Sequence, residues 1–197
     1  MKKILNLFLF SIIFFSNTNN SFSMEPDVFI QATVNKAANT LSSNLNKEER
    51  IEELKQIARE TVDITGIGLY SLGSHRKNLN KSQLSDYKKF FEEYFLKSFS
   101  SRLAEYSNPE IEVISKNKIN NNYTIVLSKL VGTDIRPEVK IEWRVYTKNS
   151  DNLLIRDLII EGLSLARTQK EEFNSIINSN DGDIEVLLKN LTNFSSQ

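Results

Sequence analysis

The chain contains no cysteine and a single histidine, His75, among its 197 residues. Without a thiol, the protein cannot form a disulfide, bind zinc or an iron–sulfur cluster through cysteine, use a cysteine nucleophile or carry a bacterial lipoprotein anchor. One histidine is also too few for a histidine-rich metal site. We therefore expect neither a metal nor a cofactor, and most familiar catalytic groups are excluded before any motif is considered.

An excess of positive charge is missing as well, since 25 Lys and Arg residues balance 25 Asp and Glu residues. A nucleic-acid binder needs a basic surplus, because its affinity comes largely from displacing counterions from phosphates. The neutral total leaves a local basic patch possible. We nevertheless expect no nucleic-acid partner.

Long hydrophobic runs are confined to the N-terminus. Two lysines precede an apolar run over residues 4–15, and the polar stretch NTNNSFS follows it. This order is typical of a secretory signal peptide, and cleavage is expected between Ser23 and Met24. The alternative is a membrane anchor, but the run is short of the roughly 20 residues that span a bilayer. We expect a signal peptide at 1–23, and an exported chain without cysteine indicates a bacterial periplasmic protein.

The rest of the chain reads as helices, then strands, then helices. Apolar residues recur three and four apart in the helical segments, and the segment near 80–106 carries a face rich in Phe and Tyr. The stretch 63–73, DITGIGLYSLG, is a short apolar piece whose structure we leave open. The predicted helices span residues 26–45, 47–62, about 80–106, 164–178 and 184–191.

After Pro109 the hydrophobic period changes to two, which predicts strands. In the clearest one, Val139, Ile141, Trp143 and Val145 share one face and polar residues share the other. Short turn-rich connections predict an antiparallel meander, so 24–197 reads as one α+β domain with helices on one face of a four-stranded sheet. The predicted strands are Ile111–Ser115, Tyr123–Val131, Val139–Tyr146 and Leu153–Ile160.

Candidate catalytic groups are few, and each has a simpler structural interpretation. His75 lies in a polar loop beside Arg76 and Lys77, so we do not assign it as a general base. Three glycines, at 66, 68 and 73, do not match a phosphate-binding loop, and no lysine of the Walker type follows them. We expect these glycines to serve helix packing or a bend.

Asp157 and Glu161 could act as an acid–base pair, because they lie four residues apart at the end of a strand. In a strand, this spacing separates them by some 13 Å, at ~3.3 Å per residue. That is too far for a close carboxylate pair. We expect each carboxylate to bind a cation or a backbone N–H and to fix the turn into the next helix.

The segment from Ile141 to Phe173 resembles the MlaC family, also called the toluene-tolerance family. It reads IEWRVYTKNSDNLLIRDLIIEGLSLARTQKEEF and has the family order of a strand with a central Trp, a turn, a strand ending D-x-x-x-E-G-x-S, and a helix. Arg156 and Leu153 depart from the pattern, where bulky apolar or aromatic residues are common. The matching positions are Trp143, Arg144, Asp157, Glu161, Gly162, Ser164 and Phe173.

The resemblance extends over nearly the whole mature chain. Further matching positions upstream are Leu72, Gly73, Gln83, Phe90, Phe95 and Tyr106. The stretch Asp181–Leu191, DGDIEVLLKNL, is similar to the C-terminal turn and helix of the family. Each motif is weak alone, but their order and spacing together are specific.

The resemblance implies a periplasmic phospholipid carrier, with an NTF2-like sheet and helices that enclose an apolar cavity for acyl chains. Such carriers pass lipid between an outer-membrane lipoprotein complex and an inner-membrane ABC transporter with its MCE-domain subunit, which helps to maintain outer-membrane lipid asymmetry. We expect the cavity to be lined by the apolar sheet face and the inward side of the aromatic helix. The predicted lining residues are Leu69, Leu72, Phe91, Phe95, Ile141, Trp143, Val145 and Leu158.

Two other classes of function stay open at this point. One is a ligand-free interaction or assembly module of the cell envelope, with a solid core in place of a cavity. The other is a small exported enzyme that uses Asp157 or His75 as a base. Neither accounts for the ordered match to the family, and we expect a protein that is not an enzyme.

Overall fold

The computed structural model describes residues 24–106, 109–134 and 136–196, so the predicted signal peptide lies outside the described residues. The helices are α1 (Pro26–Leu41), α2 (Lys47–Thr61), α3 (Ile64–Ser71), η1 (His75–Lys77), α4 (Lys81–Leu103), α5 (Leu165–Asn178) and α6 (Ile184–Ser196). The strands are β1 (Ile111–Asn120), β2 (Tyr123–Leu130), β3 (Val139–Tyr146), β4 (Leu154–Ile160) and β5 (Leu163–Ser164).

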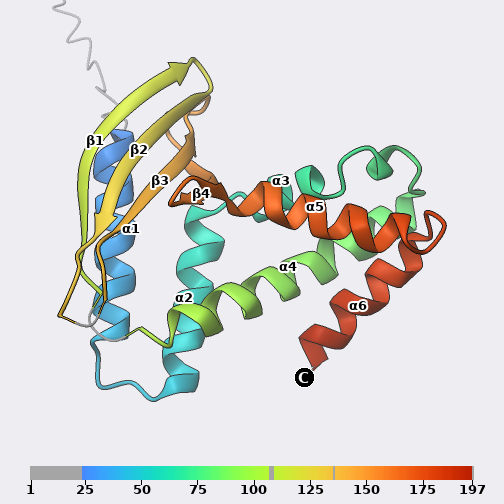
Figure 1. The fold of residues 1–197 in the computed structure, drawn as a ribbon, viewed down its shortest axis with the longest axis horizontal. Coiled ribbons are helices and arrows are strands. Elements are labelled where there is room, and N and C mark those ends of the chain that lie inside the picture. The colour runs from blue at the N-terminus through green and yellow to red at the C-terminus, as the bar shows by residue number, and fades with distance from the viewer. Residues whose placement is uncertain (1–23, 107–108, 135, 197) are drawn as a thin grey trace, which may run out of the picture.

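The strands form one antiparallel sheet in the order β1-β2-β3-β4-β5 (Figure 1). The prediction of an antiparallel α+β fold is confirmed, but the prediction of four strands was wrong, because the sheet has five. Positive φ angles at Glu161 (49°) and Gly162 (82°) turn the chain back, so that β5 pairs with the end of β4. Two residues are too few to show an alternating pattern, so this strand could not be predicted.

One face of the sheet is apolar, as the alternation in β3 predicted. Ile141, Trp143 and Val145 are buried, and Lys140 and Arg144 on the opposite face are exposed. Helix α1 runs along the apolar face beside β1 and β2 (Figure 1). Its residues complete what we call the sheet cluster: Ile30, Val34, Val126, Leu130, Ile141, Trp143, Val145, Leu153 and Ile155.

A second group of apolar side chains, the helical cluster, joins α3, α4, α5 and α6. Helix α4 packs on α2, α3 and α6, while α3 and α5 reach the sheet at β4. Aromatic rings fill the centre, where Phe91 lies 5.7 Å from Tyr87 and 6.0 Å from Phe173, measured between ring centroids. The buried members are Ala58, Ile64, Ile67, Leu72, Tyr87, Phe91, Leu96, Ala166, Phe173, Ile177, Ile184, Leu187, Leu188 and Leu191.

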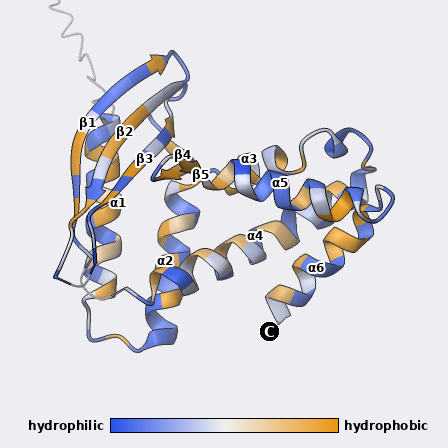
Figure 2. Cartoon of the chain, in the orientation of Figure 1, coloured by the Kyte–Doolittle hydropathy of each residue, from blue (hydrophilic) through white to orange (hydrophobic). Residues whose placement is uncertain are grey.

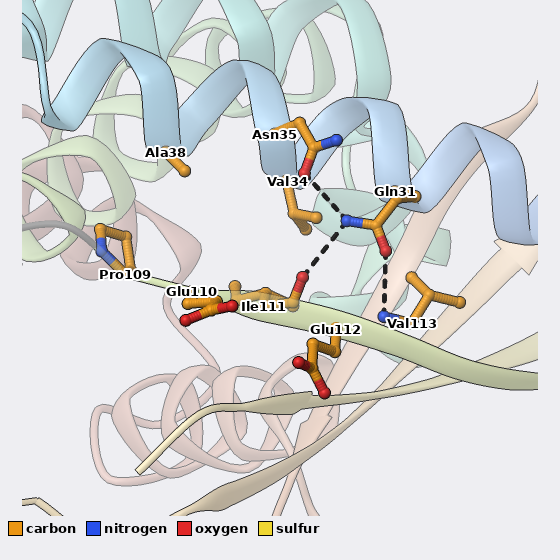
Figure 3. A pocket seen from close by; sticks show the side chains of 9 residues that line it. All are labelled: Gln31, Val34, Asn35, Ala38, Pro109, Glu110, Ile111, Glu112 and Val113. Carbon is orange, nitrogen blue, oxygen red and sulfur yellow. Dashed lines mark hydrogen bonds between the residues drawn. The ribbon is translucent and has the colours of Figure 1, made fainter. Parts of the chain in front are cut away.

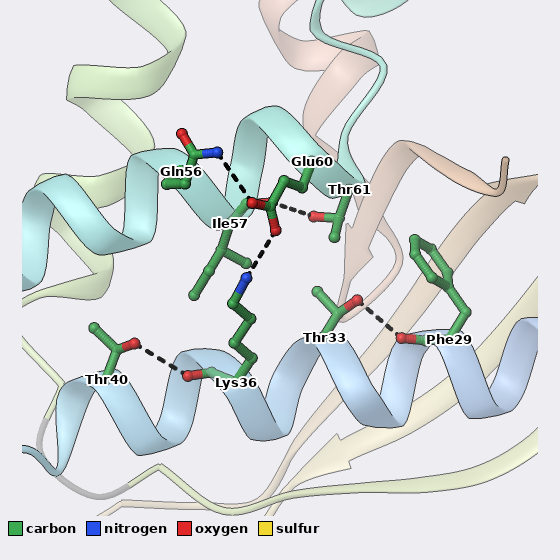
Figure 4. A network of polar contacts seen from close by, with 8 residues as sticks. All are labelled: Phe29, Thr33, Lys36, Thr40, Gln56, Ile57, Glu60 and Thr61. Carbon is green, nitrogen blue, oxygen red and sulfur yellow. Dashed lines mark hydrogen bonds and ion pairs between the residues drawn. The ribbon is translucent and has the colours of Figure 1, made fainter.

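Helices α1 and α2 are joined on their outer sides by a polar network (Figure 4). Lys36 donates to the Glu60 carboxylate at 2.7 Å, and Gln56 donates to the same carboxylate at 3.0 Å. These hydrogen bonds hold the pKa of Glu60 below its usual value. Both members of the ion pair are about half exposed, so solvent screens it and it orients the helices more than it stabilises them.

Several elements differ from their predicted bounds, and three of them differ by four residues or more. Strand β1 continues from Ser115 to Asn120, although its second half is mostly hydrophilic (Figure 2). Pairing with the buried-face residues of β2 keeps it extended, with bulges at Ile114 and Ile119. Helix α1 ends at Leu41, which leaves Leu45 exposed, and α6 continues to Ser196.

Tyr87 supports a test of the helical cluster at alkaline pH. Its hydroxyl donates to the Gly68 carbonyl at 2.8 Å, and burial raises the pKa of Tyr87 above its usual 10.0. In the unfolded chain Tyr87 ionises near pH 10, while in the folded protein it stays protonated. Stability is therefore full below pH 10 and falls above it, by about 1.4 kcal/mol per pH unit for one such group.

We expect a Tyr87→Phe variant to lose about 1 kcal/mol at pH 7, because the hydrogen bond is gone, and to show a smaller loss of stability above pH 10. Burial also raises the pKa of Tyr94, so part of the alkaline loss remains. Denaturant unfolding at pH 7 to 11 measures both effects. Equal alkaline slopes for the two proteins would contradict the burial of Tyr87.

Candidate functional site

Seven of the eight predicted lining residues fall into two groups, one in each apolar cluster. Leu72 and Phe91 belong to the helical cluster and Phe95 packs against it, while Leu69 is half-buried on α3. The remaining four lie on the apolar sheet face, with Ile141, Trp143 and Val145 in the sheet cluster and Leu158 packed against it.

These residues also differ in how deeply their side chains are buried. Leu72 and Val145 are 0% exposed and Phe91 is 1% exposed, so these side chains have the burial of ordinary core. Leu69, Phe95 and Leu158 are half-buried, which leaves part of each side chain available to a ligand. That the eight line a cavity stays a prediction.

Phe99 is an apolar residue that the sequence prediction left out. It stacks on Phe95, with ring centroids 5.6 Å apart and an interplanar angle of 10°. Both rings are half-buried on α4, next to the helical cluster. Their spacing of four residues on a helix was the signal that could have paired them.

Val62 joins the two clusters, because it packs against both. It follows α2 and forms a bridge with Ile155 of β4, where the Asp63 N–H donates to the Ile155 carbonyl at 2.9 Å. The two apolar groups therefore meet at the point where α2 and α3 touch the sheet. A ligand held between sheet and helices would lie against this junction.

Arg156, which departs from the family pattern, fixes the same junction from the sheet side. Its Nε donates to the Asp63 carboxylate at 2.6 Å, and its Nη1 donates to the Tyr123 hydroxyl at 2.9 Å. The guanidinium also lies 3.6 Å from the Tyr146 ring centroid. Asp63 in turn caps α3 by accepting from the Gly66 N–H at 2.9 Å. Arg156 thus ties β4 to the start of a helix.

Asp157 and Glu161 stabilise the turn between β4 and α5, as predicted from the sequence. Asp157 is 4% exposed and accepts from the Ser164 hydroxyl at 2.7 Å and the Ala166 N–H at 3.0 Å. Glu161 accepts from the Lys140 N–H of the neighbouring strand. The Asp157 carboxylate is bound within the turn, and the Glu161 carboxylate ties the turn to β3, which favours the structural interpretation over acid–base chemistry.

The glycines also have structural roles. A Cβ at Gly68 would lie 2.6 Å from Phe91 Cδ1, so only glycine allows α3 to approach α4 this closely. Gly73 has a φ of 57° after the end of α3, a conformation that favours glycine. The expected roles of the glycines in packing and bending are confirmed.

His75 is half-buried at the start of η1.

Two open hollows lie away from the junction. One, of about 540 Å³, lies between α1 and the start of β1 (Figure 3). The other, of about 450 Å³, has mostly charged walls, from α2, α4 and the end of α6. Neither matches the predicted apolar cavity between sheet and helices, which stays a prediction.

The described residues hold no group of three or more His, Cys, Asp or Glu that could bind a metal ion. In the same part of the chain, no helix combines the length and apolarity needed to cross a bilayer. The protein is therefore a small α+β protein. Its sheet and helices bury two apolar clusters that meet at Val62.

The chain belongs to the MlaC family, because the family model described as MlaC protein matches residues 30–193. The resemblance found in the sequence is thereby confirmed. No curated protein matches the chain.

A solved structure of a phospholipid-binding protein from Ralstonia solanacearum, in complex with a phospholipid, is similar to this one. The TM-score is 0.74 at 17% sequence identity, and the match covers 88% of this chain and 98% of that one. At this identity the likeness shows a shared fold. The fold of this chain is therefore one that holds a phospholipid in another protein.

Proposed function

We propose that this protein is a phospholipid carrier of the periplasm, which moves lipid between the outer and inner membranes as a component of an Mla-type ABC transport system. The observation that carries the proposal is the family match over residues 30–193. The phospholipid in the similar Ralstonia solanacearum structure supports the ligand class. The proposal includes export by a signal peptide at 1–23 and docking to an MCE-domain protein and an outer-membrane lipoprotein complex.

The need for such a carrier follows from the hydrophobic effect. At ~0.8 kcal/mol per buried CH₂, the two acyl chains of a phospholipid cost on the order of 20 kcal/mol to expose to water. A bare lipid therefore does not cross an aqueous gap at a useful rate. A carrier must offer apolar surface about as favourable as the bilayer, since a much tighter site could not release its lipid.

The acyl chains are placed at the junction of the two apolar clusters. We expect the side chains of Leu69, Phe95, Phe99 and Leu158, which are half-buried, to contact the acyl chains. We expect fully buried residues such as Val145 to form the wall behind them. Apolar contact of this kind requires no reacting group. The headgroup then remains near the surface, where water solvates it.

Transfer of a fluorescent phospholipid from donor to acceptor vesicles tests the proposal. We expect the wild-type mature protein to accelerate transfer, and a Phe95→Ala/Phe99→Ala variant to slow it several-fold by removing apolar contact area. Lys88→Ala, at an exposed position on the same helix, is the matched control and keeps the wild-type rate. Transfer no faster with protein than without it would reject the carrier function.

A further inference from the structure

The hollow between α1 and β1 has the form of a groove beside the edge of a sheet (Figure 3). β1 is the first strand in the sheet order, so no strand among the described residues pairs with its outer side. The residues of this wall are 109–113, and the facing wall of α1 consists of Gln31, Val34, Asn35 and Ala38.

The side chain of Gln31 occupies the place of a missing strand. Its Nε2 donates to the Ile111 carbonyl at 3.2 Å, and its Oε1 accepts from the Val113 N–H at 3.0 Å. A carboxamide carries the same donor and acceptor as a peptide bond, and an added strand binds a sheet edge through such backbone pairs. The groove thus already holds one peptide-like group, supplied by the protein itself.

The backbone of β1 leaves this edge available. The Val131 N–H donates to the Glu110 carbonyl at 2.8 Å, which places Glu110 among the residues hydrogen-bonded towards β2. Bonding direction alternates along an antiparallel strand, so Ile111 and Val113 direct their N–H and C=O groups outward. In the structure, the Gln31 amide takes up the Ile111 carbonyl and the Val113 N–H.

The two sides of the groove differ in chemistry. Towards α1, Ile111, Val34 and Ala38 present apolar surface. On the opposite face of the edge, Glu110 and Glu112 present carboxylates, and Glu112 lies 3.4 Å from the Lys129 ammonium. An extended segment with small apolar residues at alternate positions and basic residues between them is complementary to both sides.

We propose that this groove binds an extended basic–apolar segment of a partner protein, which pairs with β1 at Ile111 and Val113 and displaces the Gln31 amide. Gln31 acts as an internal cap that keeps the edge from pairing until the partner arrives. The groove shares no lining residue with the side chains proposed to contact lipid, so the protein can hold lipid and partner together. Loss of peptide binding and loss of bound lipid are therefore measured separately.

A synthetic peptide, acetyl-Val-Lys-Val-Lys-Val-amide, provides the probe, and its affinity is measured by NMR titration of the mature protein. We expect Gln31→Ala to bind it at least about fivefold tighter than the wild type, because the competing amide is gone. The largest shifts are expected at Ile111 and Val113. A peptide N-methylated at alternate amides is expected to lose the binding.

Val113→Pro removes the N–H that the partner needs and spares the ladder to β2, because that N–H bonds to Gln31. We expect this variant to lose at least about tenfold in affinity. Should it fail to fold, Glu110→Lys tests the same groove through its charge and is expected to weaken binding by a similar factor. Equal affinity of the N-methylated peptide, or no gain in Gln31→Ala, would overturn the proposal.

Discussion

Val145→Glu is expected to prevent the protein from folding. Val145 is 0% exposed in the sheet cluster, where its strand partners are Thr124 and Ile155. The substitution removes apolar burial and places a carboxylate among apolar side chains, at a total cost of about 4 kcal/mol or more. Domains are stable by roughly 5 to 15 kcal/mol, so a loss of this size or more removes the whole margin of a protein at the lower end of that range. Expression level and circular dichroism of the purified protein measure the effect.

Leu158→Glu is the informative comparison, because Leu158 lies on the same sheet face but is half-buried. Its carboxylate can reach water, so we expect this variant to fold. It is also expected to lose bound phospholipid, since the charge lies where acyl chains are placed. A folded Val145→Glu protein, or a Leu158→Glu protein with its full lipid content, would show that core and lining were assigned to the wrong residues.

Gly68→Val is expected to destabilise the protein by about 3 kcal/mol or more, through overpacking. A Cβ at this position already lies 2.6 Å from Phe91 Cδ1, and valine adds two methyl groups. Phe91 cannot move aside, because Tyr87 and Phe173 pack against its ring. The displaced helix also breaks the hydrogen bond from Tyr87 to the Gly68 carbonyl. Urea unfolding measures the loss.

Thr65→Val provides the matched control on the same helix, where the side chain is exposed. This variant also introduces valine into α3, but at a position outside the α3–α4 contact. We therefore expect the free energy of unfolding to change by no more than about 0.5 kcal/mol. Comparable losses in the two variants would indicate a general effect of valine on this short helix. The close approach at Gly68 would then not be what holds α3 to α4.

The parts of the fold that the sequence predicted are those with a clear hydrophobic period. Alternation in β3 identified its buried face, because a strand covered on one side must alternate. The second half of β1 was missed, since Lys116 and Lys118 carry no such signal. Pairing with β2 and the ion pairs of Lys116 with Glu25 and Asp27 hold this half in place. Leu45 was assigned to α1 by its spacing, but the helix ends at Leu41.

The candidate site was harder to predict, because a cavity wall and a solid core are built from the same types of apolar residue. Val145 and Leu158 are equally apolar and share a face, yet one is fully buried and the other is not. The difference depends on where the helices lie against the sheet, which no local pattern encodes. The junction at Val62 and the Arg156–Asp63 pair likewise join segments far apart in the sequence.

We propose that the mature protein holds a phospholipid, and mass spectrometry of an organic extract detects such a lipid. The protein is expressed with its signal peptide in a bacterial host, purified in the mature form and extracted. We expect diacyl phospholipid at about one molecule per protein. Folded protein that yields no phospholipid, and that remains empty after incubation with phospholipid vesicles, would contradict the account.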